Sequence, residues 1–220
     1  MNKLSLPVLA LALAGSAHAQ LASCSSDAVP QPAALLERFI SADCERCWAD
    51  AQTPDAAAGT LAIDWVAPGS RGDDAPLAAV ATTDAVLRLQ ALRKPAPAAA
   101  ASHFTRRSEG APRLRVAHGL PVNDYIGTSI ELPPGGGPWR AWLLLVETLP
   151  RGAEGTPVER NLVRNAFTAD WPAGAKAARY ELRPMHIAEG AKPERLRVVG
   201  WIEDSRGRVR SIAQSQCGKE

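Results

Sequence analysis

After its first 20 residues the sequence has no long hydrophobic run. Each later stretch free of charged residues is shorter than the roughly 18 residues that a membrane-spanning helix needs. An excess of one charge is also missing, because 25 Lys and Arg stand against 23 Asp and Glu and the net charge is only +2. A balanced charge gives no argument for binding to nucleic acid or to an anionic membrane. We therefore expect no transmembrane segment and no nucleic-acid partner.

The sequence also lacks the motifs of two common enzyme classes. Ser129 and Ser211 stand outside any Gly-x-Ser-x-Gly motif, so a serine hydrolase has no support. The triple glycine at 135–137 lacks the Gly-Lys-Ser or Gly-Lys-Thr ending of a phosphate-binding loop. It is predicted to be a turn.

A metal site is not expected either. A structural zinc site needs four ligands, and the Cys-x-x-Cys sequence is not accompanied by a second such pair or by paired histidines. His103, His118 and His186 are far apart in the sequence and have no carboxylate at a ligand spacing. We interpret them as ordinary surface or turn residues, and we predict no cofactor.

The first 20 residues have the pattern of a secretory signal peptide. Lys3 supplies the positive start, residues 4–14 form a short apolar run, and residues 17–19 make an Ala-x-Ala cleavage site. We therefore expect a periplasmic or secreted protein. A second interpretation takes residues 21–24 as a lipobox that would attach a lipid to Cys24. It is the weaker one, because polar residues separate this segment from the apolar run.

The protein has four cysteines, Cys24, Cys44, Cys47 and Cys217. An oxidising compartment lets cysteines persist as disulfides, and four cysteines allow three pairings. Cys44 and Cys47 are close enough in the sequence to pair with each other, which leaves Cys24 and Cys217 as a structural disulfide between the two ends. In the loop-entropy view, that disulfide stabilises the fold by roughly 5 kcal/mol at most.

The Cys-Glu-Arg-Cys sequence at 44–47 is the main candidate for catalysis. It follows an apolar run at 35–40 that reads as a buried strand, and no Pro or Gly comes directly after it, so we expect a helix that begins at Cys44. The amides and the dipole at a helix N-terminus favour a thiolate and lower the pKa of a thiol. Arg46 would add to this effect, while Glu45 would oppose it. Cys44 is then the attacking thiol, and Cys47 resolves the mixed disulfide one turn later.

The pattern of apolar residues divides the chain into two predicted domains. Residues 21–95 show a strand, helix, strand, helix order, with a second strand at 60–66 and an amphipathic helix at 75–92, as expected of an α/β unit. Residues 96–112 are rich in Ala and Pro and are predicted to be a linker. Residues 113–217 carry short apolar runs between turns, which predicts an antiparallel β-sandwich. The strands expected there are 113–118, 125–132, 139–148, 177–183, 195–203 and 209–214.

The block at 36–47, followed by Ala49-Asp50 and Asp64-Trp65, resembles the opening of a family of secreted bacterial proteins. That family has a thioredoxin-like first half, a β-rich second half and no assigned function. Residues 160–164 and the closing strands are similar to its second half. The resemblance implies an α+β chain with two domains, in which an abbreviated thioredoxin-like α/β half precedes the sandwich.

The sequence departs from that family beside the cysteines. Asp43 and Trp48 occupy positions where family members usually carry Gly and Pro. Active thioredoxin-like proteins also place a cis-proline on a strand that faces the disulfide. We predict no such strand between Leu92 and Pro112.

Two functions follow from these patterns. In the first, the protein is an exported thiol-disulfide oxidoreductase, in which Cys44 and Cys47 are catalytic and other envelope proteins are the thiol or disulfide substrates. Asp64 and Trp65 would then lie near the pair, and Asp64 would move protons during exchange, unless it only caps the following loop. In the second, the protein is a non-catalytic envelope binding or structural protein with two structural disulfides and a degenerate redox site. The sequence indicates no particular partner and no oligomeric state.

Overall fold

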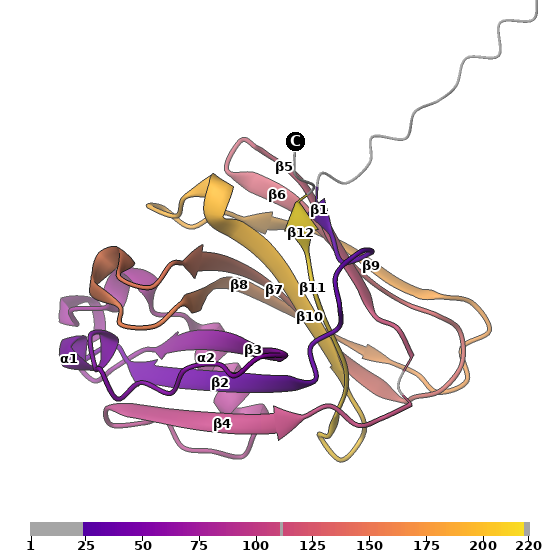
Figure 1. The fold of residues 1–220 in the computed structure, drawn as a ribbon, viewed down its shortest axis with the longest axis horizontal. Helices are drawn as coiled ribbons and strands as arrows, with labels where there is room; N and C mark the ends of the chain where they lie inside the picture. Colours follow the sequence, from indigo (N-terminus) through magenta and orange to yellow (C-terminus); the bar gives the residue numbers. More distant parts are fainter. Residues whose placement is uncertain (1–23, 111, 218–220) are drawn as a thin grey trace, which may run out of the picture.

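The computed structural model describes residues 24–110 and 112–217. The predicted signal peptide and residues 21–23 of the alternative lipobox lie outside the described residues. Two β-sheets make up most of the described chain (Figure 1). The smaller sheet has five strands in the order β12 (Gln216–Cys217), β1 (Cys24–Ser25), β5 (Arg115–Val122), β6 (Tyr125–Leu132) and β9 (Arg179–His186).

The larger sheet has seven strands. Their order is β11 (Val209–Gln214), β10 (Leu196–Glu203), β7 (Trp139–Leu149), β8 (Arg160–Trp171), β3 (Thr60–Ala67), β2 (Ala34–Ser41) and β4 (Ala100–Arg106). The β2–β3 and β3–β8 pairs are parallel, and the other pairs of this sheet are antiparallel. A parallel pair needs a crossover connection, and α1 (Glu45–Trp48) lies in the one between β2 and β3.

Helical structure is short in this fold. Besides α1, the described residues contain one α-helix, α2 (Thr83–Ala91). Four single turns of 3-10 helix complete the elements: Gly72–Asp74, Ala78–Val80, Ala153–Gly155 and Pro193–Arg195. No helix among the described residues is long and apolar enough to cross a membrane.

The core has two layers, one on each face of the large sheet. On one face, Val116 and Ile130 of the small sheet pack against Leu143, Leu145 and Val198 of β7 and β10. On the opposite face, α2 packs against the large sheet in a second cluster. That cluster includes Leu35, Phe39, Ile63, Trp65, Ala85, Leu89, Trp142, Leu144 and Trp201. The alternation of side chains along each strand supplies both layers from the same strands.

The thioredoxin-like α/β half predicted for residues 21–95 is wrong. β2 and β3 belong to the seven-stranded sheet, because β8 pairs with β3 where Asp64 lies opposite Leu162. The segment predicted as a linker contributes β4, which pairs with β2 along seven residues. β3 is almost entirely buried, so both of its edges need hydrogen-bonding neighbours. Strands from both sides of residues 96–112 therefore lie in one sheet.

Most of the individual strands are confirmed. β2, β3, β5, β6, β7, β9, β10 and β11 lie within a few residues of their predicted bounds. β8 was not predicted as a strand, because Asn161, Arg164 and Asn165 interrupt its apolar pattern. The helix predicted at 75–92 is shorter than expected and begins after Thr82, whose hydroxyl oxygen accepts a hydrogen bond from the backbone N–H of Asp84.

Candidate functional site

The four cysteines form the two predicted disulfides. Cys44 pairs with Cys47, and Cys24 pairs with Cys217 across 193 residues. No free cysteine occurs in the part of the chain that the structure describes. The sulfur of Cys24 is bonded to Cys217, so it offers no free thiol for the lipid of the alternative interpretation.

The Cys44–Cys47 disulfide lies in a packed apolar cluster. Both cysteines are only 8% exposed, and they contact Ile40, with Trp48, Leu77 and Ala99 packed around them. Figure 1 places α1 at the end of β2, away from the five-stranded sheet. Thiol-disulfide exchange needs an incoming thiolate to reach one of the sulfurs. The burial of both cysteines restricts that approach.

The helix that carries this disulfide is a single turn. It begins at Glu45, so Cys44 is the residue before it, and the backbone of Cys44 is not helical. A helix of four residues aligns few peptide dipoles, so the effect expected on the Cys44 thiol is weak. Arg46 is exposed on this turn and points its charge into solvent-accessible surroundings. The cis peptide bond found among the described residues joins Gly137 and Pro138, which are not among the residues packed around the cysteines.

Asp64 is engaged in a buried ion network. Its carboxylate accepts hydrogen bonds from Arg38 at 2.7 Å, from Arg160 at 2.6 Å and from the backbone N–H of Asn161 at 3.0 Å. Asp64, Arg38 and Arg160 are each at most 2% exposed. Both oxygens of this carboxylate are therefore already engaged by fixed donors, which supports a structural role for Asp64. The carboxylate that caps the loop after β3 is instead Asp43, which accepts hydrogen bonds from Ser70.

Arg160 connects this network to α1. It donates to the backbone carbonyl of Trp48 at 2.9 Å, and its guanidinium lies 4.7 Å from the centre of the Trp48 ring. Burial lowers the pKa of Arg160, while the charge of Asp64 opposes that shift. A small cavity of about 220 Å³ is lined by Cys47, Arg38 and Arg160 among others. Asp50 lies in the same wall and Asp64 pairs with both arginines, so the charges around this cavity balance.

Trp65 lies on the opposite face of the sheet from Asp64, because neighbouring strand residues alternate. Its ring stacks with Phe39 at 6.2 Å, and its indole N–H donates to Glu37 at 3.2 Å. Trp65 is fully buried. The sequence expectation that Asp64 and Trp65 lie together near the cysteines is not met by this arrangement.

A second buried ion network occupies the face that carries Trp65. Arg88 of α2 makes two hydrogen bonds to Glu37, at 2.7 and 2.8 Å, and an ion pair to Glu203 at 2.7 Å. The indole N–H groups of Trp142 and Trp201 donate to Glu203. Although burial alone would lower the pKa of Arg88, the charges of Glu37 and Glu203 raise it above its usual value.

Sequence reasoning missed this second network. Its local signal was present, because Glu37 and Arg38 interrupt an otherwise apolar strand. Charged residues are rarely fully buried unless they are paired, so that interruption indicates buried partners. The partners Arg88 and Glu203 lie 51 and 166 residues further along the chain, and nothing in the sequence pattern identifies them.

A large cavity lies beside Glu203, away from the residues that line the small cavity at Cys47. Its volume is about 870 Å³, and it opens between the end of α2, β4 and the turn between β10 and β11. Trp139 and His103 contribute to its wall, and burial lowers the pKa of His103. Arg93 and Arg206 also line it, and neither guanidinium has an ion-pair partner among the described residues.

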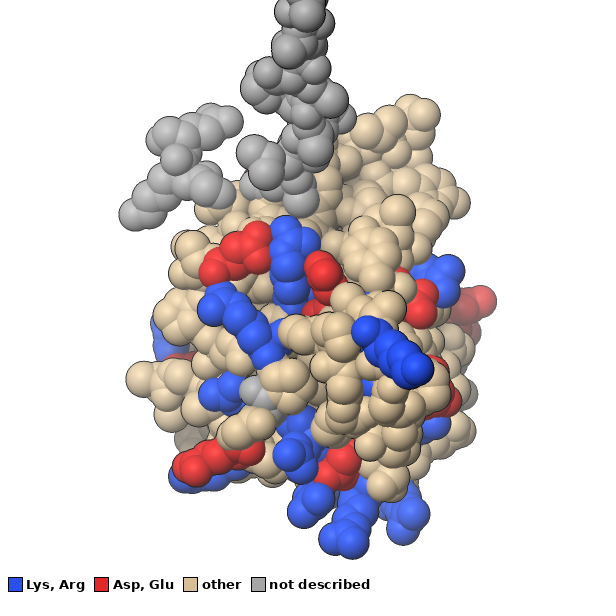
Figure 2. All heavy atoms as spheres, turned by 90° about the vertical axis from the view of Figure 1, so that its right-hand side faces the viewer, with Lys and Arg blue, Asp and Glu red and all other residues tan. Residues whose placement is uncertain are grey.

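Uncharged residues make up most of the surface on the side of the molecule where the five-stranded sheet lies, with charged side chains of both signs among them. Figure 2 shows several Lys and Arg side chains at the lower end of this view, with Asp and Glu side chains both beside them and higher up. In Figure 1 the same end holds the turn between β10 and β11, which borders the large cavity. The positive charge is therefore local and does not extend over the whole face.

Comparisons with known proteins give no assignment. No protein-family model matches the sequence, and no curated protein matches it. A similar solved structure is the crystal structure of protein AGR_C_4864 from Agrobacterium tumefaciens, with 12% identity and a TM-score of 0.46. The alignment covers 87% of this chain and 96% of that one. A similarity this distant assigns no function, and the resemblance to the secreted bacterial family stays a prediction.

Proposed function

We propose that the chain is an exported, non-catalytic binding protein, held by two structural disulfides, whose large cavity takes a small anionic molecule. The observation that carries the proposal is the contrast between two places in the fold. The Cys44–Cys47 disulfide is buried and packed, whereas the open cavity lies elsewhere and presents free cationic groups. The two disulfides are compatible with an extracellular location.

The burial of Cys44 and Cys47 supports a structural role. Reactive cysteines lie in partly exposed, electropositive surroundings, while buried cysteines in apolar packing are inert. Ile40 and Leu77 cover this disulfide, and the four-residue α1 gives its first cysteine little help from a helix dipole. The pair then fixes the turn between β2 and α1.

The large cavity supports a binding role. About 870 Å³ is within the range of small-molecule sites, roughly 300 to 1,000 Å³. The cavity wall also holds three carboxylates, and each of them is paired with an arginine other than Arg93 and Arg206. Within the described part of the chain, the guanidinium groups of Arg93 and Arg206 are unpaired and suit a carboxylate or a phosphate. Trp139 offers an apolar ring beside them. A small organic anion with an apolar part matches this combination.

Variants of the disulfide and variants of the cavity test the two parts of the proposal separately. We expect a Cys44→Ser, Cys47→Ser protein to fold, to lose roughly 2 kcal/mol of stability from its short loop, and to bind anions as the parent does. We expect an Arg93→Gln, Arg206→Gln protein to bind citrate, benzoate and phosphate more weakly in calorimetry at constant ionic strength. Equal binding of all three probes by the parent and the arginine variant would refute the binding site.

A second candidate function is thiol-disulfide exchange, and one observation favours it. Cys47 borders the small cavity that Arg38 and Arg160 also line, so two guanidinium groups lie near one of its sulfurs, with Asp50 in the same wall. A nearby guanidinium group stabilises a thiolate, so it would favour reduction of the disulfide there. In this case Cys47, more than Cys44, would carry the thiolate.

The reduction potential separates the two functions. A structural disulfide lies below about −300 mV, whereas exchange catalysts lie above it. We expect a value below that limit for Cys44–Cys47, measured by equilibration with dithiol buffers and alkylation, and no catalysis of insulin reduction. A higher potential together with catalysis that is lost on Cys47→Ser substitution would establish the exchange function instead.

A further inference from the structure

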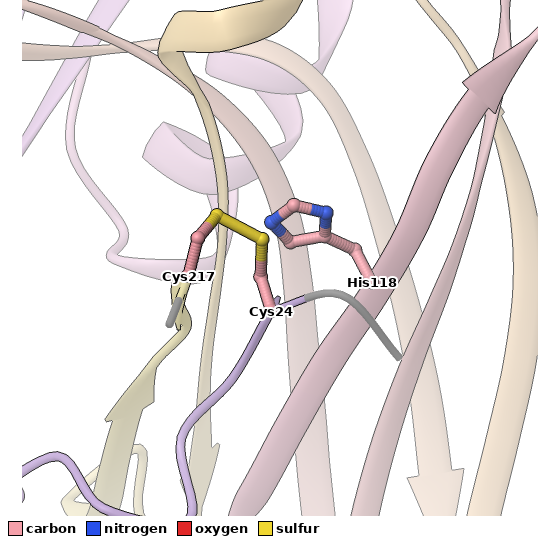
Figure 3. Close-up of side chains that lie close together, drawn as sticks. All are labelled: Cys24, His118 and Cys217. Atoms are coloured by element: carbon pink, nitrogen blue, oxygen red, sulfur yellow. A yellow bond between two sulfur atoms is a disulfide. The ribbon is translucent and has the colours of Figure 1, made fainter. Parts of the chain in front are cut away.

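Three side chains with metal-binding atoms stand in a row across the five-stranded sheet. The strand register places Cys24 of β1 opposite Cys217 of β12 on one side and opposite His118 of β5 on the other. Residues directly opposite one another project to the same face of a sheet. Figure 3 shows the imidazole ring of His118 beside the disulfide. The sulfur atoms and one ring nitrogen all lie within 4.8 Å of one another.

The orientation of His118 leaves a lone pair toward the sulfurs. Its Nδ1 lies 3.0 Å from the carbonyl oxygen of Gly119, and because a carbonyl only accepts, Nδ1 carries the proton. Nε2 has no hydrogen-bond partner among the described residues, although His118 is only 6% exposed. In Figure 3 this second nitrogen points to the disulfide. A buried nitrogen lone pair without a partner needs an explanation.

We propose that reduction of the Cys24–Cys217 disulfide converts this row into a site for one thiophilic divalent metal ion of the zinc type, held by Cys24 Sγ, Cys217 Sγ and His118 Nε2. A dithiol supplies the two electrons. It attacks the sulfur of Cys217, the bond to Cys24 breaks, and the dithiol closes into its own disulfide while two protein thiols form. Binding of the metal ion then releases the two thiol protons, so a neutral site of two thiolates and one dication results.

The donor set and its surroundings match the chemistry of such ions. Two thiolates and a neutral imidazole are ligands that zinc prefers, and a water molecule can fill the fourth position. Histidines that bind metals almost always donate their other ring N–H to a carbonyl or a carboxylate, as His118 does to Gly119. Cys217 is partly exposed while Cys24 is buried, which gives a reductant access to one sulfur.

The site would also replace the connection that reduction removes. Cys24 and Cys217 lie on two-residue strands that pair with each other, and their Cα atoms are 4.0 Å apart. A shared metal ion keeps these strands together without the covalent bond. The end-to-end connection therefore has an oxidised form and a metal-bound reduced form.

The test uses the mature chain with Cys44→Ser and Cys47→Ser, so that the remaining thiols belong to Cys24 and Cys217. After reduction with a dithiol and removal of the reagent without oxygen, Co²⁺ is titrated with detection of thiolate-to-cobalt absorption. Zn²⁺ is then titrated in competition with a chromogenic chelator. We expect one ion per chain for the reduced protein and none for the oxidised protein.

The role of His118 is tested by His118→Ala in the same background, with His103→Ala as the matched control. We expect affinity to fall at least about tenfold for His118→Ala and to stay unchanged for His103→Ala. Circular dichroism follows folding, and Zn²⁺ is expected to raise the unfolding temperature of the reduced chain. Failure of the reduced protein to bind either ion overturns the proposal, whether the chain is folded or not. Equal affinity of His118→Ala and its parent overturns it as well.

Discussion

Replacement of Arg88 by Met is expected to destabilise this protein more than removal of any exposed charge. The guanidinium of Arg88 is 1% exposed and serves two buried carboxylates, those of Glu37 and Glu203. Methionine fills much of the same space and leaves both carboxylates without a cation. The side chain of Arg88 also lies 4.9 and 5.0 Å from the ring centres of Trp142 and Trp201, so its removal disturbs that stack.

The magnitude follows from the loss of one partner in a buried ion pair. Such a loss costs about 3 to 5 kcal/mol, because a buried charge remains uncompensated. The indole N–H groups of Trp65, Trp142 and Trp201 still donate to these carboxylates. We therefore expect a loss of stability at the lower end of this range. A domain of this size has roughly 5 to 15 kcal/mol of stability in total, so the variant should remain folded but marginal.

The defect should also depend on pH. Without Arg88, burial and mutual repulsion raise the pKa of at least one of the two carboxyl groups above its unfolded value of about 4.3. The folded variant then holds a proton that the unfolded chain has lost, so its stability falls as pH rises above that value. The difference between parent and variant is therefore expected to be larger at pH 8 than at pH 5.

Urea unfolding of the oxidised protein, followed by tryptophan fluorescence and circular dichroism, measures these differences. The control is Arg140→Met, since Arg140 pairs with Asp170 at the surface, where the two side chains are 50% and 74% exposed. We expect at most about 1 kcal/mol for that variant. A loss below about 1 kcal/mol for Arg88→Met, or an equal loss at both pH values, would refute the assignment of a buried, charge-compensating role.

Three further changes test other parts of the fold. Cys24→Ser together with Cys217→Ser should lower the free energy of unfolding by up to about 5 kcal/mol in urea, because the closed loop spans 193 residues. Gly200→Ala should cost about 1 to 3 kcal/mol in the same assay, since an added Cβ would lie 2.8 Å from Val116 of the facing sheet. The pKa of His103 is lowered by burial, so stability should fall as pH drops below about 6.5, and His103→Gln should make that dependence shallower.

Each of these expectations has a contradicting result. A double serine variant as stable as its parent would mean that the end-to-end disulfide does not constrain the unfolded chain. An unchanged midpoint for Gly200→Ala would show that the two sheets are less closely packed at this glycine. An identical pH dependence for His103→Gln and the parent would assign that dependence to other groups. The charges of Glu37 and Glu203 raise the pKa of His103, whereas the charges of Lys94 and Arg88 lower it.

The sequence by itself determined the local elements and the disulfide pairing. The strands at 125–132 and 209–214 coincide with β6 and β11, because apolar residues between turn residues have few other ways to become buried. Cys44 and Cys47 pair because three residues of separation bring them together in one turn. The same local signals, however, gave the wrong helix length around Ala75 and missed β8.

Only the tertiary structure decided which strands are neighbours and which charges meet. The edge of β3 accepts β8 because backbone hydrogen bonds are the same for any strand, so a sequence pattern specifies burial without specifying a partner. That one pairing turns two predicted domains into one sheet and brings Arg160 to Asp64. Alternation along β3 places Trp65 on the face of the other network. The register between distant strands places His118 beside Cys24. Periodicity records which face of each strand is buried, whereas contacts between distant strands depend on how the whole sheet assembles.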